Sequence, residues 1–189
     1  MLIKQAIILA GGLGKRLGKK SEKCPKPMQK VNNEPFLNNI IWNLKRHNIK
    51  NIILSIGYLS DIFKNYYGNG STMGVNIEYV EEHKPLGTGG ALKRCSELLD
   101  ESFILLNGDT IFDINYHDLS KTFQDNKLGH LALNYVGDVS RYGEVQTEGS
   151  NIVSFNEKTN KKSGFINAGV GIFRKKIIIV NYIFITYKC

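Results

Sequence analysis

The segment from Ala6 to Arg16 reads Ala-Ile-Ile-Leu-Ala-Gly-Gly-Leu-Gly-Lys-Arg, an apolar run followed by a glycine-rich stretch that ends in two cations. The apolar run predicts a buried strand, and the glycines predict a loop at its carboxyl end. Further along, Pro25-Lys26-Pro27-Met28 places another cation in a stiff turn. Such a loop can bring backbone N–H groups and fixed positive charge up to a polyphosphate.

This loop matches neither of the two common phosphate-binding motifs. A dinucleotide pattern that starts at Gly12 requires a glycine where the chain has Leu17, and a Walker A loop requires Ser or Thr where it has Arg16. An ordinary strand-to-helix turn, with glycines for tightness, is the simpler interpretation. The cations that follow the glycines favour an anion site over that interpretation.

Up to about residue 136, short apolar runs alternate with helical stretches. We predict strands at residues 6–10, 51–56, 75–80, 103–106 and 131–136, and helices at 35–47, 61–67, 88–99 and 118–124, with Thr88 capping the third helix. This βαβαβ order predicts an α/β fold whose mostly parallel sheet is covered on both faces. Ligands of such sheets bind beyond the carboxyl ends of the strands, where the glycine-rich loop lies.

After Gly137 the pattern changes to short strands joined by turns. We predict these strands at residues 144–146, 152–155 and 166–173, and we expect them to form a β-rich lobe of the same domain. The length of 189 residues is that of one domain.

Composition narrows the class of protein. The three cysteines, Cys24, Cys95 and Cys189, lie far apart and match no disulfide framework or zinc pattern, so we expect a reducing, cytoplasmic location. We also expect no signal peptide, because the first ten residues follow a strand pattern. The longest apolar stretch, residues 177–187, is too short to span a bilayer.

The net charge of +8 is concentrated near the glycine-rich loop. The cations of this cluster are Lys15, Arg16, Lys19, Lys20, Lys23, Lys26 and Lys30. A solvated face or a nucleic-acid patch would explain such a cluster. Stacking aromatic residues are not interleaved with it, so a compact anion such as a nucleoside triphosphate fits better.

The segment from Leu9 to Leu17, taken with Pro25-Lys26-Pro27-Met28, resembles the N-terminal signature of sugar-1-phosphate nucleotidylyltransferases. That signature usually has threonine where this chain has Lys15. The resemblance runs from about Leu2 to Phe173, and within the family it is strongest to D-glycero-D-manno-heptose 1-phosphate guanylyltransferases. It implies a Rossmann-like fold of the nucleotide-diphospho-sugar transferase type.

Later motifs follow the family pattern in the same order. Pro85-Leu86-Gly87-Thr88-Gly89-Gly90-Ala91 resembles the segment that meets the nucleotide base, and Asn107-Gly108-Asp109 resembles the strand end that delivers a metal-binding Asp. Tyr142-Gly143, Glu157-Lys158 and Asn167-Ala168-Gly169 resemble the sugar-phosphate pocket.

The resemblance implies a role for each matching residue. Arg16, Lys26 and Asp109 would be catalytic, with Arg16 at the leaving phosphates, Lys26 at the α-phosphate and Asp109 as the ligand of Mg²⁺. The residues expected to bind the nucleotide are Leu9, Ala10, Gly11, Gly12, Gly14, Lys15, Gly87 and Thr88. Those expected to bind the sugar phosphate are Asn107, Gly143, Glu157, Lys158 and Asn167.

The implied reaction is attack of a sugar 1-phosphate, heptose or hexose, on the α-phosphorus of a nucleoside triphosphate, with GTP favoured. The resemblance implies one nucleotidyltransferase domain over residues 1–189, C-terminally incomplete relative to the family. Residues 1–136 would bind nucleotide and residues 137–175 the sugar phosphate. We expect no nucleic-acid or membrane partner, and a homo-oligomer stays possible. We also expect a role in lipopolysaccharide or capsule biosynthesis.

Two other functions stay open. No Asp or Glu follows Glu157, although the family supplies a second metal-binding Asp late in the chain, so a nucleotide or nucleotide-sugar binding protein with impaired catalysis is one alternative. A basic α/β module that binds nucleic acid is the other, and a steep salt dependence of such binding would favour it.

Overall fold

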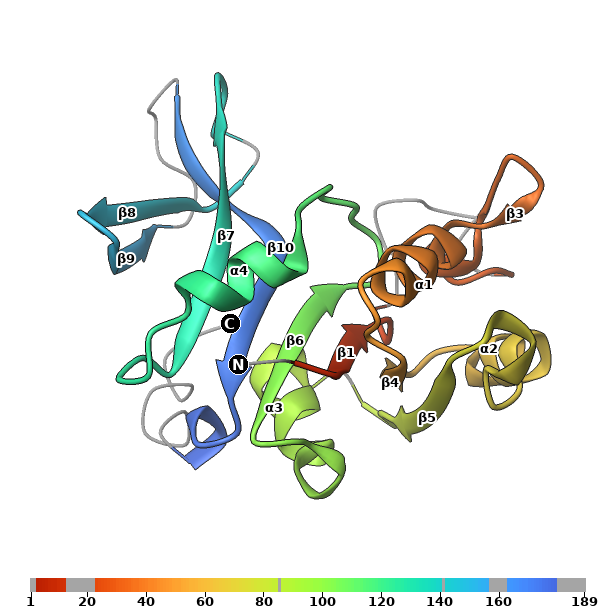
Figure 1. Cartoon of the computed structure of the whole chain (residues 1–189). Coiled ribbons are helices and arrows are strands. Elements are labelled where there is room, and N and C mark those ends of the chain that lie inside the picture. The colour runs from red at the N-terminus through yellow and green to blue at the C-terminus, as the bar shows by residue number, and fades with distance from the viewer. Residues whose placement is uncertain (1–2, 13–22, 85, 141, 157–162, 180–189) are drawn as a thin grey trace.

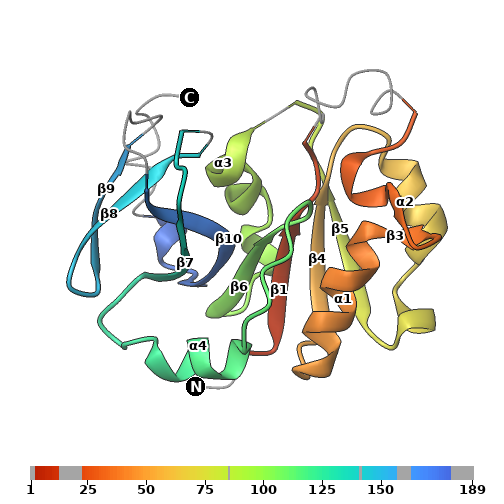
Figure 2. The same cartoon turned by 90° about the horizontal axis from the view of Figure 1, so that it is seen from above.

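The computed structural model describes residues 3–12, 23–84, 86–140, 142–156 and 163–179. These residues form a mixed eight-stranded sheet with helices on both faces (Figures 1 and 2). Within the described ranges, no helix has the length and apolar character needed to cross a membrane.

Four neighbouring strands of the sheet run parallel, in the order β5-β4-β1-β6. Their bounds are β1 (Gln5–Leu9), β4 (Asn51–Ile56), β5 (Asn76–Glu81) and β6 (Ser102–Asn107). This parallel core, flanked by helices, confirms the predicted fold class. At its carboxyl edge Leu9 lies opposite Ser55 on one side and Asn107 on the other, so residues distant in sequence meet there.

The helices connect these strands and cover them. Their bounds are α1 (Phe36–Arg46), α2 (Ser60–Tyr67), α3 (Gly87–Arg94) and α4 (Tyr116–Thr122), with short 3-10 helices η2 (Lys26–Met28), η3 (Ser71–Met73) and η4 (Ser96–Leu98). A small hairpin of β2 (Lys30–Val31) and β3 (Glu34–Pro35) precedes α1. The helix predicted over 88–99 was wrong in both bounds, since α3 begins at Gly87 and ends at Arg94, and Thr88 lies inside its first turn.

The core has one layer on each face of the sheet, as the alternation of strand side chains requires. On the α1, α2 and α4 face, Ile8, Leu54 and Leu106 pack with apolar residues of these helices. On the α3 face, Ile7 and Leu105 pack with the residues of α3 and of the segment after it. Every one of these five strand residues is buried, so the parallel core is rigid support for its carboxyl edge.

The rest of the sheet is antiparallel. It contains β7 (Gly129–Val136), β8 (Glu144–Glu148), β9 (Asn151–Asn156) and β10 (Gly164–Arg174). β10 pairs antiparallel with β6 and joins the two parts of the sheet. The strand predicted at 131–136 is present as β7, but it pairs antiparallel with β10 and does not continue the parallel series.

Candidate functional site

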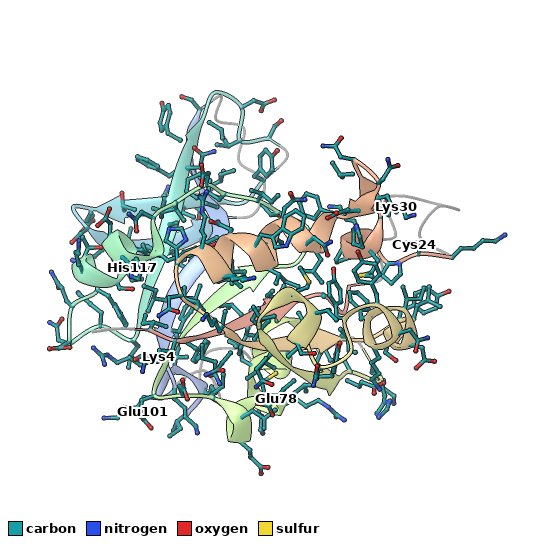
Figure 3. All side chains as sticks on the ribbon, turned by 45° about the vertical axis from the view of Figure 1, so that its right-hand side comes forward. Lys4, Cys24, Lys30, Glu78, Glu101 and His117 are labelled. Atoms are coloured by element: carbon teal, nitrogen blue, oxygen red, sulfur yellow. The ribbon has the colours of Figure 1, made fainter. Side chains whose placement is uncertain are left out.

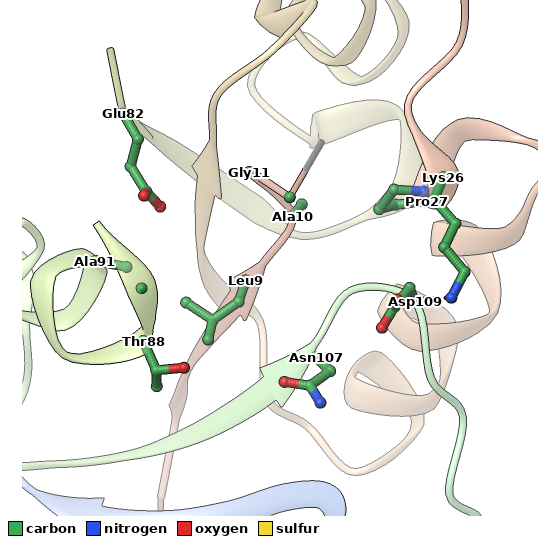
Figure 4. Close-up of a pocket in the computed structure, with 12 residues that line it drawn as sticks. Leu9, Ala10, Gly11, Lys26, Pro27, Glu82, Thr88, Ala91, Asn107 and Asp109 are labelled. Atoms are coloured by element: carbon green, nitrogen blue, oxygen red, sulfur yellow. Dashed lines mark hydrogen bonds and ion pairs between the residues drawn. The ribbon is translucent and has the colours of Figure 1, made fainter. Parts of the chain in front are cut away.

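A cleft of about 390 Å³ opens at the carboxyl edge of the parallel strands (Figure 4). Its walls come from the end of β1, the η2 turn, the residue after β5, the start of α3 and the end of β6. The lining residues are Leu9, Ala10, Gly11, Gly12, Lys26, Pro27, Glu82, Gly87, Thr88, Ala91, Asn107 and Asp109. Nine of the twelve are among the site residues predicted from the sequence.

The glycine-rich loop leaves β1 along one wall and has little room for side chains. The backbone N–H of Ala10 donates to the carbonyl of Ser55 at 2.7 Å. A Cβ on Gly11 would lie 3.2 Å from Glu82 Oε1, and a Cβ on Gly57 would lie 3.0 Å from the carbonyl oxygen of Gly11. Glycine at position 11 therefore lets the loop pass close to β4 and to Glu82. Three other predicted residues of this loop, Gly14, Lys15 and Arg16, lie outside the described residues.

At one end of the cleft Lys26 and Asp109 form an ion pair, with Nζ donating to Oδ2 at 2.7 Å. Lys26 belongs to η2, where Pro25 and Pro27 stiffen the backbone and Met28 is buried; Cys24 and Lys30, labelled in Figure 3, flank this turn. The two side chains are 44% and 40% exposed, so incoming ligands can reach both. The structure thus brings the predicted phosphate cation and the predicted metal ligand into contact.

The carboxylate of Asp109 is the donor type that Mg²⁺ prefers. In the part of the chain that the structure describes, no group of three or more His, Cys, Asp or Glu side chains could hold a metal ion. Mg²⁺ usually takes one or two carboxylates and completes its shell with phosphate oxygens and water. A single carboxylate in a cleft with room for phosphates fits that kind of binding.

The opposite end of the cleft is formed by the start of α3 and by Glu82 (Figure 4). Gly87 has a φ of 67°, a conformation that favours glycine, although a Cβ there would meet none of the described residues within 4 Å. Its glycine is therefore explained by backbone conformation and not by crowding within the chain. Thr88 lines the same end and is exposed.

Glu82 is the functional candidate that the sequence analysis missed. It follows β5 directly, and its carboxylate points into the cleft in Figure 4. Oε1 accepts a hydrogen bond from Ser55 Oγ at 2.7 Å, and Oε2 accepts one from the backbone N–H of Leu86 at 3.3 Å. The signal was an acidic residue at the end of a strand, close to a glycine-rich helix start.

The residues predicted to bind the sugar phosphate are only partly brought together. Asn107 lines the cleft, and a Cβ on Gly169 would lie 3.0 Å from its Nδ2. Asn167 Oδ1 accepts from the backbone N–H of Gly169 at 2.9 Å, at a register irregularity of β10, and this part of β10 packs beside Asn107. Gly143 directly precedes β8 and is not among the residues that line the cleft. Glu157 and Lys158 lie outside the described residues.

A second hollow of about 400 Å³ lies between α1, α2 and η3. Its lining residues are Glu34, Asn38, Trp42, Lys45, Tyr66, Thr72 and Met73. It shares no residue with the cleft at the carboxyl edge of the sheet.

Three comparisons with known proteins agree on the family of this chain. A family model of nucleotidyl transferases matches residues 5–184. D-glycero-alpha-D-manno-heptose 1-phosphate guanylyltransferase of Campylobacter jejuni is 42% identical over 174 residues, which cover 92% of this chain and 77% of that protein. The enzyme of the same name from Aneurinibacillus thermoaerophilus is 41% identical over 178 residues, covering 92% of this chain and 76% of its own.

A solved structure is similar over the same length. The crystal structure of HddC from Yersinia pseudotuberculosis, complexed with GMP-PN, superposes with a TM-score of 0.82 at 32% identity. The match covers 93% of this chain and 79% of that one.

Proposed function

This chain belongs to the nucleotidyl transferase family, and we propose that it transfers the nucleotidyl group of GTP to a heptose or hexose 1-phosphate and releases pyrophosphate. The observation that supports this most directly is the cleft with Lys26 and Asp109 at one end and Glu82 with the glycines of α3 at the other. A nucleoside triphosphate has the matching polarity, with its phosphates at one end and its base at the other.

The chemistry needs no nucleophile from the protein, because the attacking phosphate oxygen is already ionised. Catalysis then consists of holding two anions in line and neutralising the charge that develops on the phosphates. We assign the α-phosphate to Lys26, because its ammonium group lies in a proline-stiffened turn at the cleft, 2.7 Å from the Asp109 carboxylate. The proposed roles of Arg16, Lys15, Gly14 and Lys158 rest on the family resemblance.

Asp109 would hold the Mg²⁺ ion, which when bound neutralises phosphate charge and helps to orient both reactants. What the protein itself supplies for metal binding is a carboxylate in a fixed position. Asp109 follows Gly108, whose backbone N–H donates to the carbonyl of Leu9 at 2.8 Å, so the end of β6 is tied to the end of β1.

The preference for GTP is supported by the carboxylate of Glu82 at the base end. Guanine presents two donors on one edge, N1–H and the 2-amino group, and a carboxylate accepts from both. Adenine presents an unprotonated ring nitrogen at the corresponding position, which a carboxylate repels. A site with a fixed acceptor discriminates strongly, because the wrong base leaves a partly buried polar group unpaired.

The sugar 1-phosphate is proposed from the relatives and from the irregular part of β10 at residues 167–169. Both named relatives are heptose 1-phosphate guanylyltransferases. In this chain Asn107 and Asn167 both lie next to Gly169, and Asn107 lines the cleft together with Asp109. Their amide groups are suitable partners for sugar hydroxyls.

The test is pyrophosphate release in the presence of Mg²⁺, with GTP, ATP, CTP or UTP as donor and heptose, mannose or glucose 1-phosphate as acceptor. We expect release that requires both substrates and is fastest with GTP. Release without a sugar phosphate, or equal rates with all four nucleotides, would contradict the proposal. GTP binding with no release would instead favour the binding protein without catalysis.

A further inference from the structure

We propose that Ser55 is a positioning residue for nucleotide selection, acting by holding the Glu82 carboxylate in the orientation that reads guanine. This inference rests on the proposed function, since it concerns how the same cleft chooses its base. Ser55 lies in β4, away from the ligand space, and is not among the cleft-lining residues. Its effect on the ligand would be transmitted through Glu82.

The position of Ser55 is unusual for a hydroxyl. It is fully buried, and it interrupts an otherwise apolar buried run in β4 from Ile52 to Ile56. In register it lies between Leu9 of β1 and Val80 of β5. Burying a hydroxyl costs free energy unless it finds a partner, and Ser55 Oγ finds one in Glu82 Oε1 at 2.7 Å.

Glu82 is held from more than one side. Its backbone N–H donates to the carbonyl of Ile56, which fixes the start of the side chain beside β4. Oε2 accepts from the backbone N–H of Leu86, just before α3, and Gly11 leaves room for Oε1. Each carboxylate oxygen has a further lone pair for a donor in the cleft.

The Ser55 hydrogen bond sets the rotation of the carboxylate. Without it, the side chain keeps its backbone anchor and its weaker contact at Leu86 but can turn about its last bonds. The expected loss is therefore in base discrimination, because the 2-amino group of guanine requires a correctly aimed oxygen. The phosphates are held at the other end of the cleft, so the reaction step itself is expected to change little.

The experiment measures the dissociation constants of GTP and inosine triphosphate by calorimetry with Mg²⁺ and without a sugar phosphate. Inosine lacks only the 2-amino group, so the ratio of the two constants reports that one contact. Wild-type protein should prefer GTP by about tenfold, as expected for a hydrogen bond to a charged group. In Ser55→Ala we expect this preference to fall by about fivefold, with kcat in the full reaction within about twofold of wild type.

A double-mutant cycle with Glu82→Gln separates a positioning role from a merely structural one. If Ser55 acts through Glu82, adding Ser55→Ala to Glu82→Gln should change the preference little further, so the two effects are not additive. Additive effects, or an equal weakening of both nucleotides in Ser55→Ala, would overturn the inference.

Ser102 supplies the matched control. It is also a buried strand serine, at the start of β6, but among the described residues its Oγ has no hydrogen-bond partner. Ser102→Ala should leave the nucleotide preference unchanged, and an equal loss there would overturn the role given to Ser55. If Ser55→Ala does not fold, Ser55→Cys keeps the volume with a weaker donor and should shift the preference in the same direction.

Two kinds of failure are distinguishable. Tight GTP binding with the same preference in wild type and Ser55→Ala overturns the role of Ser55 alone. Failure of the wild-type protein to bind any nucleoside triphosphate overturns the proposed function, and this inference with it.

Discussion

Gly108, which lacks a side chain, controls the position of the neighbouring Asp109 carboxylate, which we propose as the metal ligand. It is buried between Asn107 and Asp109, and a Cβ there would lie 2.8 Å from the carbonyl oxygen of Leu9 and 3.2 Å from Cβ of Ala10. The nearest atom belongs to the backbone of β1, which cannot turn aside. Any side chain at this position must push the end of β6 away from the end of β1.

We therefore expect Gly108→Ala to destabilise the protein by about 1–3 kcal/mol, the usual cost of overpacking, and to lower metal-dependent turnover. Urea denaturation and the pyrophosphate assay measure the two effects. Gly137→Ala is the control, since Gly137 is exposed and an added Cβ there would meet nothing within 4 Å. Equal behaviour of the two variants would show that the contact with β1 is not tight.

His130 gives the stability a predictable pH dependence. Its ring lies near Phe123 and its Nε2 is 3.2 Å from Thr122 Oγ1, and burial lowers its pKa below the ordinary value of 6.5. The unfolded chain therefore takes up a proton at higher pH than the folded protein. The contribution of neutral His130 to the free energy of unfolding is complete above pH 6.5. It is lost as pH falls toward and through the lowered pKa of His130.

We expect His130→Gln to remove this part of the fall in the free energy of unfolding between about pH 7 and pH 5. Denaturant unfolding at several pH values checks it. His117→Gln, at an exposed position of α4, is the control and should leave the fall in place. If the free energy of unfolding of His130→Gln falls with pH as steeply as that of the wild type, other groups account for the fall.

At the scale of single residues, the sequence located most of the cleft but not Glu82, the acid that we propose contacts the base. The glycines, Lys26 and Asp109 belong to motifs with an evident chemical meaning. Glu82 is one of three glutamates in and directly after β5, with Glu78 and Glu81. Only the folded sheet shows which of these three lines the cleft, because β4 and β5 must pair before Ser55 can reach Glu82.

Between elements, the ion pair of Lys26 and Asp109 connects η2 with the end of β6 across 83 residues of sequence. Both partners are well exposed, so the pair contributes at most about 1 kcal/mol to stability. We expect Lys26→Met to keep the fold while turnover drops by about 100- to 1000-fold, since it removes a cation from the developing phosphate charge.

Circular dichroism and the pyrophosphate assay test this change. Lys64→Met is the matched control, because Lys64 pairs with Glu81 on the outside of α2 and β5 and lines no part of the cleft. Normal turnover in Lys26→Met would remove Lys26 from the mechanism.

The same ion pair makes a prediction about metal binding. In the absence of nucleotide, a divalent cation must compete with the Lys26 ammonium for the Asp109 carboxylate. Lys26→Met should therefore bind Mn²⁺ more tightly by about two- to fivefold, because an exposed pair contributes about 0.2–1 kcal/mol. Electron paramagnetic resonance of free Mn²⁺ measures it, and unchanged or weaker binding would contradict the competition.

Element boundaries were predictable where the hydrophobic pattern decides them, but not where a cap decides them. The predicted strand at 51–56 matches β4, which is apolar except at Asn51 and Ser55. The helix predicted at 118–124 begins earlier because Asn115 Oδ1 accepts from the backbone N–H of His117 and of Asp118. The direction of β7 was not predictable, since it depends on β10, a partner that lies later in the chain.

For the molecule as a whole, ligand binding should appear as a gain in thermal stability. A ligand that binds only the folded state at about 100 times its dissociation constant adds about 2.7 kcal/mol. For a chain of this length we expect GTP with Mg²⁺ to raise Tm by about 5–10 °C under those conditions. ATP at the same concentration should raise it less, and equal shifts would contradict base selection by Glu82.

The two predicted parts of the domain are joined by one continuous sheet. β10 pairs with β6 of the parallel core and with β7 and β8 of the antiparallel part. The predicted nucleotide part, residues 1–136, and sugar part, residues 137–175, therefore share one sheet. Their exact division remains a prediction, which separate expression of the two parts would test.

Trp42 is the chain's one tryptophan, and its place in the hollow between α1, α2 and η3 decides what its fluorescence can report. The residue is 46% exposed and does not line the nucleotide cleft, so we expect its emission to be partly solvent-shifted already. Nucleotide titrations followed by intrinsic emission should be nearly silent even when binding is tight. A fluorescent guanine analogue would give the optical signal of binding that Trp42 does not.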